Sequence, residues 1–432
     1  MFGARSQSAC AQRTPMQHRC LFVALGVAAV VSGGTTATVQ TAKADELTEV
    51  EAIRRGLERG ALRDVLEGQQ AVARTDAIAA GVWPNPTAGY AHEQTSGALG
   101  SREEYAWLTQ RFDLSGRRGL RVAAAEKRVR AASSAAAAQR LDMAAEIRLR
   151  FFTVLHHQHR LAALDRWASE VQESAAVVTK RQSAGDVAGY DRQRIGIEAN
   201  AAEARASQET AALALARERL AAVTGFDNDA AGQELRVIGG LLPESPLPAV
   251  EILLEALGTR PDIQALLARS DAAGDESRAA ARWWIPEVLL GGGMKSVETD
   301  GDRSTGFTAI GEVPLPLFDR DQASRGRAQA ELMIARGELE LERAKAEGEI
   351  RGLYAQATKL AAAAQAASTA TANSTQLAKT AAAGYRGGEL GIIELLDAQR
   401  SVTEADLRVV DLAWAARVAR VELERITGGG LP

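Results

Sequence analysis

The residues of this chain that come closest to a chemical site are three histidines, His156, His157 and His159, in one short segment. His156 and His159 would share a helix face, because residues three positions apart are neighbours on a helix surface. A zinc or copper site needs three or four converging ligands, and neither a cysteine nor a tight group of carboxylates accompanies these histidines. We therefore expect surface residues of a helix and no metal site.

The rest of the sequence predicts no enzyme site. The glycine run Gly291–Gly293 lies within a segment of alternating polarity, whereas a phosphate-binding loop joins a strand to a helix. No nucleophile stands beside a candidate base at a spacing typical of a catalytic site. We expect a protein that is not an enzyme and that holds no cofactor.

Long helices are the elements that must position any functional residue. Residues 87–242 and 317–431 contain no proline and are rich in Ala, Leu, Glu, Arg and Gln, which are strong helix formers. Each interval has one glycine-containing interruption, at 183–189 and at 384–391, where a helix can stop and reverse. We predict two helical hairpins whose turns lie far from the strands.

The last long helix predicts close packing against a partner helix. Its small and apolar residues recur in alternating steps of three and four, a period of 3.5 that marks a coiled-coil seam. The seam consists of Leu395, Ala398, Val402, Ala405, Val409, Leu412, Ala416, Ala419, Leu423 and Ile426. The many alanines let the partner approach closely. The simplest alternative is an isolated antiparallel coiled coil with no further role.

Four segments alternate between apolar and polar residues, at 87–98, 103–115, 286–297 and 305–318. Strands of about ten residues with one apolar face are typical of outer-membrane barrels, although a soluble sandwich alternates in the same way. Residues suited to an aromatic belt at the membrane interface are Trp83, Tyr90, Tyr105, Trp107, Trp283 and Trp284. Four strands cannot close a barrel, and an open sheet edge in lipid leaves backbone groups unpaired. Three copies would supply twelve strands to one shared barrel.

The composition excludes some partners and one kind of membrane span. A net charge of −4 gives no electrostatic reason to expect nucleic acid as a partner. No stretch beyond the N-terminal region approaches the run of about 18 apolar residues that a spanning helix needs. A membrane crossing must therefore be made by strands.

The N-terminal region predicts export from the cytoplasm. The apolar run Leu21–Val31 follows basic residues and is followed by a small-residue cleavage site at Ala42–Ala44, which is the pattern of a secretory signal peptide over residues 1–44. Both cysteines, Cys10 and Cys20, lie within this segment, so the exported protein has no disulfide. The residues before Cys20 are not those of a lipid-modified cysteine, and we expect no lipid anchor.

The sequence repeats itself at an interval of about 200 residues. Pro84 returns as Pro286, 202 residues later, and Gly225 returns as Gly428, 203 residues later. So long an interval indicates two fused copies of one structural half. We predict a signal peptide at 1–44, a first repeat at 45–225 with strands at about 87–115 and a helical hairpin at about 117–225, a linker at 226–259, and a second repeat at 260–432 with strands at about 286–318 and a helical hairpin at about 320–428.

Three motifs make the mature chain resemble the TolC family of outer-membrane efflux factors. They are Arg260–Ile263, Val313–Arg320 with the sequence VPLPLFDR, and Gly384–Gly388 followed by Ile392–Arg400. The second motif is most similar to the CzcC-type branch, which works with heavy-metal exporters of the cobalt-zinc-cadmium type. The resemblance implies a mainly α fold with a small transmembrane β part, assembled as a trimer. A twelve-strand barrel in the outer membrane would continue into a twelve-helix tunnel in the periplasm.

The resemblance also implies a function. The protein would be the outer-membrane channel of a tripartite, RND-type efflux system, a passive duct that exports heavy-metal cations. Its partners would be two further copies of itself, outer-membrane lipid, a periplasmic adaptor of the membrane fusion class and an inner-membrane pump. One alternative is a conduit for organic drugs or type I secreted polypeptides, and another is a soluble periplasmic coiled-coil scaffold.

The family narrows its tunnel at the periplasmic tip with acidic residues, and the matching positions here are Glu394 and Asp397. They lie three residues apart and so on one helix face. Three copies would form stacked rings of negative charge at a cation-attracting constriction. The alternative is that both are solvated residues of an exposed helix face.

Other residues at the turns match the family less completely. Tyr385 corresponds to a tyrosine of the gate network, but Leu390 stands where some members carry a basic residue. The first hairpin turn holds Asp186 and Asp191 as weaker gate candidates. The resemblance therefore implies a gate with Tyr385 but leaves an ionic bridge at Leu390 open.

Overall fold

The computed structural model describes residues 46–97, 100–226, 235–243, 245–371 and 374–429. The predicted signal peptide, with Cys10 and Cys20, lies outside these residues, as do Ala98 and part of the predicted linker. No helix within the described ranges is both long enough and apolar enough to cross a membrane.

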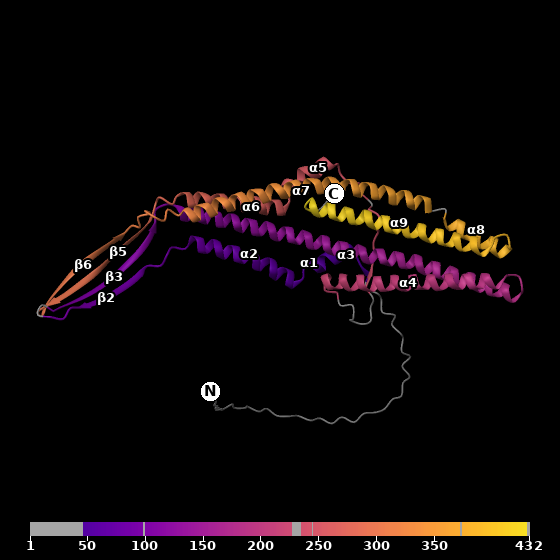
Figure 1. Cartoon of the computed structure of the whole chain (residues 1–432), viewed down its shortest axis with the longest axis horizontal. Helices are drawn as coiled ribbons and strands as arrows, with labels where there is room; N and C mark the ends of the chain where they lie inside the picture. Colours follow the sequence, from indigo (N-terminus) through magenta and orange to yellow (C-terminus); the bar gives the residue numbers. More distant parts are fainter. Residues whose placement is uncertain (1–45, 98–99, 227–234, 244, 372–373, 430–432) are drawn as a thin grey trace, which may run out of the picture. The chain divides into compact units, whose positions relative to one another are not determined.

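Long helices make up most of the described chain, as Figure 1 shows. The longest is α3, Arg117–Ser183, whose 67 residues extend about 100 Å at 1.5 Å per residue. A short turn leads from α3 into α4, Gly189–Thr224. In the second half α7, Gln322–Thr371, is followed by α8, Ser374–Gly387, and by α9, Ile392–Ile426. The prediction of a mainly helical fold with a small β part is confirmed.

Several shorter helices were not predicted from the sequence. They are α1 (Glu49–Leu57), α2 (Gly60–Gly81), α5 (Val250–Glu255), a 3-10 turn η1 (Ala256–Thr259) and α6 (Pro261–Ala281). Helix α2 packs on α3, and α6 packs between α3 and α7. Pro261 begins α6 at a position where its missing N–H costs nothing. One of the family-like motifs, Arg260–Ile263, is thus a helix start.

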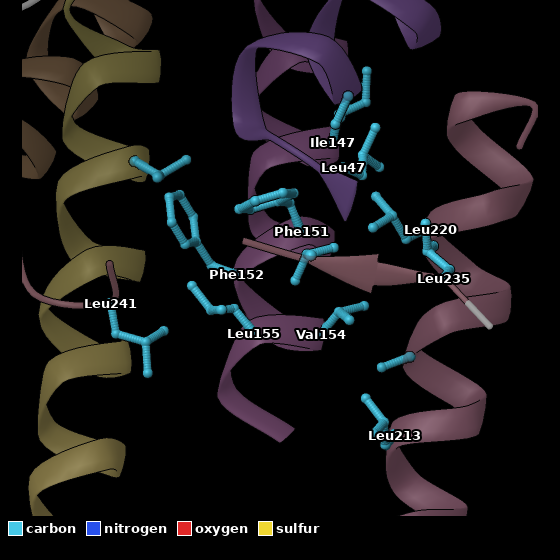
Figure 2. Close-up of a cluster of buried hydrophobic side chains, with 14 of the residues drawn as sticks. Leu47, Ile147, Phe151, Phe152, Val154, Leu155, Leu213, Leu220, Leu235 and Leu241 are labelled. Atoms are coloured by element: carbon cyan, nitrogen blue, oxygen red, sulfur yellow. The ribbon is translucent and has the colours of Figure 1, made fainter. Parts of the chain in front are cut away.

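Two very short strands join the beginning of the described chain to its middle. Strand β1, Glu46–Leu47, pairs in parallel with β4, Arg236–Val237. They cover a cluster of buried apolar side chains centred on α3, in which Phe151 and Phe152 stack edge to face at 5.3 Å (Figure 2). The cluster also holds Leu241, so the connection between the two halves is part of the core.

Two arginines of α9 fix that connection. The Arg417 guanidinium donates to the carbonyl oxygens of Gly240, Leu241 and Leu242 at 2.9 to 3.0 Å. Arg420 donates to the side chain of Ser245 at 3.0 Å. Their hydrogen bonds replace the strand or helix partners that this irregular backbone lacks.

The remaining four strands form one antiparallel sheet in the order β2-β3-β5-β6. They are β2 (Thr87–Gln94), β3 (Ser101–Asp113), β5 (Glu287–Thr299) and β6 (Asp302–Glu312). The two predicted hairpins share a sheet because β3 pairs with β5. Asp300 and Gly301 both have positive φ, the pattern of a tight type I′ turn, so β5 and β6 extend further into the predicted loop than we expected.

The predicted end of the fourth strand, Phe318, is wrong. Strand β6 ends at Glu312, and Val313–Phe318 is irregular. Pro314 and Pro316 have no N–H to donate to a neighbouring strand, which explains the early end. Strand β2 is also shorter than predicted and ends at Gln94.

The sheet has one apolar and one polar face. Register places Ala106, Met294 and Phe307 side by side, with Phe307 91% exposed. On the other face Lys295 forms an ion pair with Glu103 at 2.8 Å. The alternation that predicted the strands therefore corresponds to two chemically distinct faces.

Two residues of the predicted aromatic belt lie on the polar face instead. Trp107 pairs with Gly293 in register and covers Gly89, where an added Cβ would lie 2.3 Å from the indole ring. Tyr105 lies below the Lys295 ammonium, 4.9 Å from the ring centre. The glycines make room for Trp107 on this face, which alternation alone did not indicate.

Helix α9 buries two faces rather than the single predicted seam. Leu423 and Ile426, at the end of that seam, pack with Leu339 and Ile350 of α7. A second face contacts α3, where Gln399 donates to the hydroxyl of Ser174 at 3.1 Å. The 3.5-residue period is therefore shared between a seam to α7 and an adjacent contact with α3.

We expect Ala419→Leu to destabilise the helical region by about 1–3 kcal/mol, the usual cost of overpacking. Ala419 is buried in the seam, so a larger side chain must push the neighbouring helix away. Ala416 is equally buried but lines a groove of about 480 Å³ between α7 and the segment around Leu242, so Ala416→Leu should cost less. Denaturant unfolding of both variants in detergent measures the difference. Wild-type stability of Ala419→Leu would contradict the seam.

Candidate functional site

The turn at the end of each helical hairpin contributes to one small cluster. The Arg181 guanidinium, at the end of α3, donates to the carbonyl oxygen of Tyr385 at 2.7 Å. It also lies over the Tyr385 ring, 5.1 Å from the ring centre. Tyr385 is only 2% exposed, although its position in the last turn of α8 would suggest a surface residue. The two turns are therefore tied together by an arginine that the sequence did not single out.

The buried phenol of Tyr385 has no hydrogen-bond partner among the described residues. Burial raises its pKa, and the nearby Asp191 carboxylate raises it further, so the phenol is neutral. Tyr385 and Asp191, two of the predicted gate residues, thus lie close enough to interact, whereas Asp186 is an exposed residue of the turn.

Leu390 packs where a basic residue would be needed for an ionic bridge. A Cβ at Gly384 would lie 2.8 Å from the Leu390 side chain, so Gly384 accommodates it. The backbone N–H of Leu390 donates to the Gly384 carbonyl at 3.2 Å, which closes the end of α8. In this turn the apolar contact of Leu390 and the cation–π contact of Arg181 stand in place of an ion pair.

Glu394 and Asp397 are exposed on α9. Their neighbours Leu395, Leu396 and Ala398 are buried and fix which face of α9 points inward. Neither carboxylate takes part in an ion pair within 4.0 Å in the part of the chain that the structure describes. The single chain thus leaves both carboxylates exposed on one face of the helix.

A buried ion pair near this end was missed by the sequence analysis. Glu198 of α4 is 1% exposed, and its carboxylate accepts two hydrogen bonds from Arg400 of α9, one of them at 2.6 Å. The neighbouring α4 residues Ile195 and Ala202 are buried, so their spacing marks Glu198 as an inward-facing position. Nothing in the sequence identifies Arg400, 202 residues away, as its partner.

The expectation that the histidines are surface residues is wrong for His156. His156 is buried, hydrogen-bonded to Asp411 at 2.7 Å and stacked on Trp414 at 4.6 Å. Arg160 donates to both oxygens of the same Asp411 carboxylate at 2.7 and 2.9 Å. Because α3 carries these residues into the contact with α9, a position that looked external is covered by a helix remote in sequence.

The same polar cluster extends to α4. Glu209 accepts a hydrogen bond from Arg160 at 3.1 Å and lies 2.7 Å from the Nδ1 atom of His157. Three helices are thus joined by two carboxylates, one arginine and two imidazoles. Among the described residues no group of three or more His, Cys, Asp or Glu side chains is placed to hold a metal ion.

We expect acid to weaken this cluster. Burial lowers the pKa of His156, although Asp411 opposes the shift. Burial alone would raise the pKa of Asp411, but hydrogen bonds from Arg160 and His156 outweigh it and lower that pKa. Both groups bind protons less readily in the folded than in the unfolded chain, so their contribution is lost as pH falls.

The loss should occur in two stages, below about pH 6.5 for His156 and below about pH 3.9 for Asp411. Unfolding by urea at a series of pH values measures it. The variant His156→Gln should lack the upper stage and keep the lower one. An unfolding free energy that does not change between pH 7.5 and pH 5 in the wild type would be the opposite result.

Comparison with known proteins identifies the class of this chain. Residues 252–429 match the sequence model of the outer membrane efflux proteins. The cobalt-zinc-cadmium resistance protein CzcC of Cupriavidus metallidurans is 27% identical over 353 residues, which cover 80% of this chain and 82% of CzcC. This chain belongs to the outer membrane efflux protein family. Its family members include the outer membrane protein OprJ of Pseudomonas aeruginosa, 27% identical over 74% of this chain and 68% of OprJ.

The solved structures agree with the fold of this efflux family. A structure of CusC superposes with a TM-score of 0.76 at 20% identity and covers 90% of this chain and 93% of that one. The family places the protein in the outer membrane as an efflux channel and confirms that it is not an enzyme. A soluble periplasmic scaffold does not agree with that location.

Proposed function

We propose that the protein is the outer-membrane duct of a tripartite efflux system, assembled from three copies. The observation that carries the proposal is a four-stranded sheet with an exposed apolar face, joined directly to helices of up to 67 residues. Such a sheet suits lipid on one face, and the helices suit a tunnel wall. The proposed assembly has a twelve-strand barrel in the membrane and a twelve-helix tunnel, with two tandem structural repeats in each chain.

The two outer strands of the sheet support assembly from several copies. Strands β2 and β6 each have only one neighbour in the described chain, so each leaves one edge of backbone groups unpaired. In lipid these groups need partners, which β6 of one copy and β2 of the next can supply. The contact is head to tail, and such contacts close into rings when the rotation permits.

Exposed apolar residues on the outermost helices support the same contact. Val65 and Val72 lie 16 and nine residues before the end of α2, and Leu341 and Met333 lie 19 and 11 residues after the start of α7. Met333 is 75% exposed and Val72 63% exposed. Since both helices adjoin the sheet, Val72 of one copy and Met333 of the next lie at similar heights. Exposed patches of this kind mark interaction sites.

The trimer predicts cross-linking between copies. The only cysteines are in the predicted signal peptide, so Val72→Cys with Met333→Cys introduces the only thiols of the mature protein. On oxidation we expect covalent species up to three chains, while each single variant gives no trimer. A detergent-solubilised protein with the mass of one chain, or no cross-link in the double variant, would contradict the proposed contact.

We propose heavy-metal cations as the substrates, and a periplasmic adaptor and an inner-membrane RND-type pump as the partners. The support is the name of the relative CzcC, a cobalt-zinc-cadmium resistance protein. Deleting the gene should lower resistance to cobalt, zinc or cadmium ions, and restoring it should recover resistance. Unchanged metal resistance together with lower resistance to organic drugs would instead favour the drug conduit.

Within this duct we propose Glu394 and Asp397 as the constriction of the periplasmic tip. Both carboxylates are exposed on one face of α9, and three copies would bring up to six of them around a narrow opening. Tyr385, held by Arg181, and Asp191 would position the two hairpin turns, and Asp186 would add negative charge at the rim. The role of the constriction is to concentrate cations before export.

A further inference from the structure

A groove between α3, α8 and α9 carries excess negative charge away from the proposed constriction. Its walls include Glu170 and Glu173 of α3 and Asp406 of α9, against Arg166 and Lys379. Arg166 forms an ion pair with Asp406 at 3.0 Å. Within the described part of the chain, Glu170 and Glu173 take part in no ion pair at 4.0 Å or less, so the rim of the groove is not fully neutralised.

The floor of the groove holds a buried polar atom that lacks a partner. Gln399 is 4% exposed, and its amide nitrogen donates to the hydroxyl of Ser174 at 3.1 Å. Its carbonyl oxygen accepts no hydrogen bond from any described residue. A buried oxygen left unsatisfied costs about 1–3 kcal/mol, so a ligand that interacts with it would stabilise the site.

The electrostatics of Glu170 agree with a missing cation. Burial raises the pKa of its carboxyl, Glu173 and Asp406 raise it further, and Arg166 only partly offsets them. A cation in the groove would favour the ionised carboxylate and remove the repulsion among the three acidic residues.

We propose that this groove binds a hard divalent cation of the Ca²⁺ type. The ligands are the carboxylates of Glu170 and Asp406, the carbonyl oxygen of Gln399 and the hydroxyl of Ser174. An all-oxygen set of carboxylate, amide carbonyl and hydroxyl suits Ca²⁺ or Mg²⁺, whereas softer metals prefer histidine or cysteine. With two neutral oxygens, the site differs from clusters of three acidic or histidine ligands, and its Kd should be on the order of 10⁻⁴–10⁻³ M.

The site is separate from the proposed constriction. Gln399 and Asp406 are seven residues apart and share one face of α9, which contacts α3. Glu394 and Asp397 are exposed on another face of the same helix. A cation bound here ties α3 to α9 and does not enter the export path, so the proposal rests on the fold and not on the duct function.

The test measures Ca²⁺ uptake by the full-length protein in detergent, using equilibrium dialysis. Tb³⁺ serves as a second probe, because Trp167, one helical turn from Glu170, can sensitise its luminescence. We expect saturable uptake in the wild type and displacement of Tb³⁺ by Ca²⁺. Glu170→Gln and Gln399→Leu should each weaken binding at least tenfold.

The matched control is Glu404→Gln, the same chemical change at an exposed position of α9 outside the groove. It should bind Ca²⁺ like the wild type. The two test variants change different helices, so a folding defect in one, detected by circular dichroism, leaves the other informative. No saturable uptake by the wild type, or equal affinity in all four proteins, would overturn the site. Neither result depends on conduction or on resistance to metals.

Discussion

Replacing Arg400 with methionine should destabilise the folded protein by about 3 kcal/mol, because it leaves a buried carboxylate without its partner. Glu198 is almost completely buried and accepts both of its side-chain hydrogen bonds from the Arg400 guanidinium. Arg400 is itself partly exposed, with 43% of its side chain accessible, so we place the effect at the lower end of the range for buried pairs. Denaturant unfolding followed by circular dichroism measures the loss.

The double variant Glu198→Met with Arg400→Met separates the charge effect from packing. Removing both partners leaves no buried charge, and replacement of a buried pair by apolar residues is often nearly neutral. We expect the double variant to be more stable than Arg400→Met alone. If Arg400→Met unfolds at the wild-type denaturant concentration, the pair is not buried in the assembled protein.

Neutralising the proposed constriction, as Glu394→Gln with Asp397→Asn, should abolish most of the cation preference of the channel. Three copies would bring up to six carboxylates together, and their removal takes away the potential that concentrates cations. Planar-bilayer recordings measure the ratio of cation to anion permeability and the block by multivalent cations added on the periplasmic side. Screening makes the effect larger at low salt, where the Debye length is about 30 Å at 0.01 M.

The matched control for the constriction is Glu404→Gln, which removes one exposed carboxylate further along α9. It should change selectivity much less than the double variant. Equal selectivity and equal multivalent block in the wild type and the double variant at low ionic strength would mean that Glu394 and Asp397 do not line the narrowest point.

Local periodicity determined the features of this protein that the sequence could predict. A 3.5-residue repeat predicted the seam from Leu395 to Ile426, and its first and last members are buried. Two-residue alternation predicted four strands with one apolar face, because successive side chains of a strand point to opposite sides. Glycine in each turn predicted the hairpin ends, where Gly185 and Gly388 have positive φ.

The tertiary structure alone decided which helices and strands meet. His156 is buried because α9 brings Asp411 and Trp414 to it from more than 250 residues away. Glu198 finds Arg400 in the same way, and β3 pairs with β5 across 174 residues of register from Asp113 to Glu287. Periodicity shows which face of an element is inward, but it contains no information about the element that covers it. That choice depends on packing and charge pairing among residues far apart in the chain.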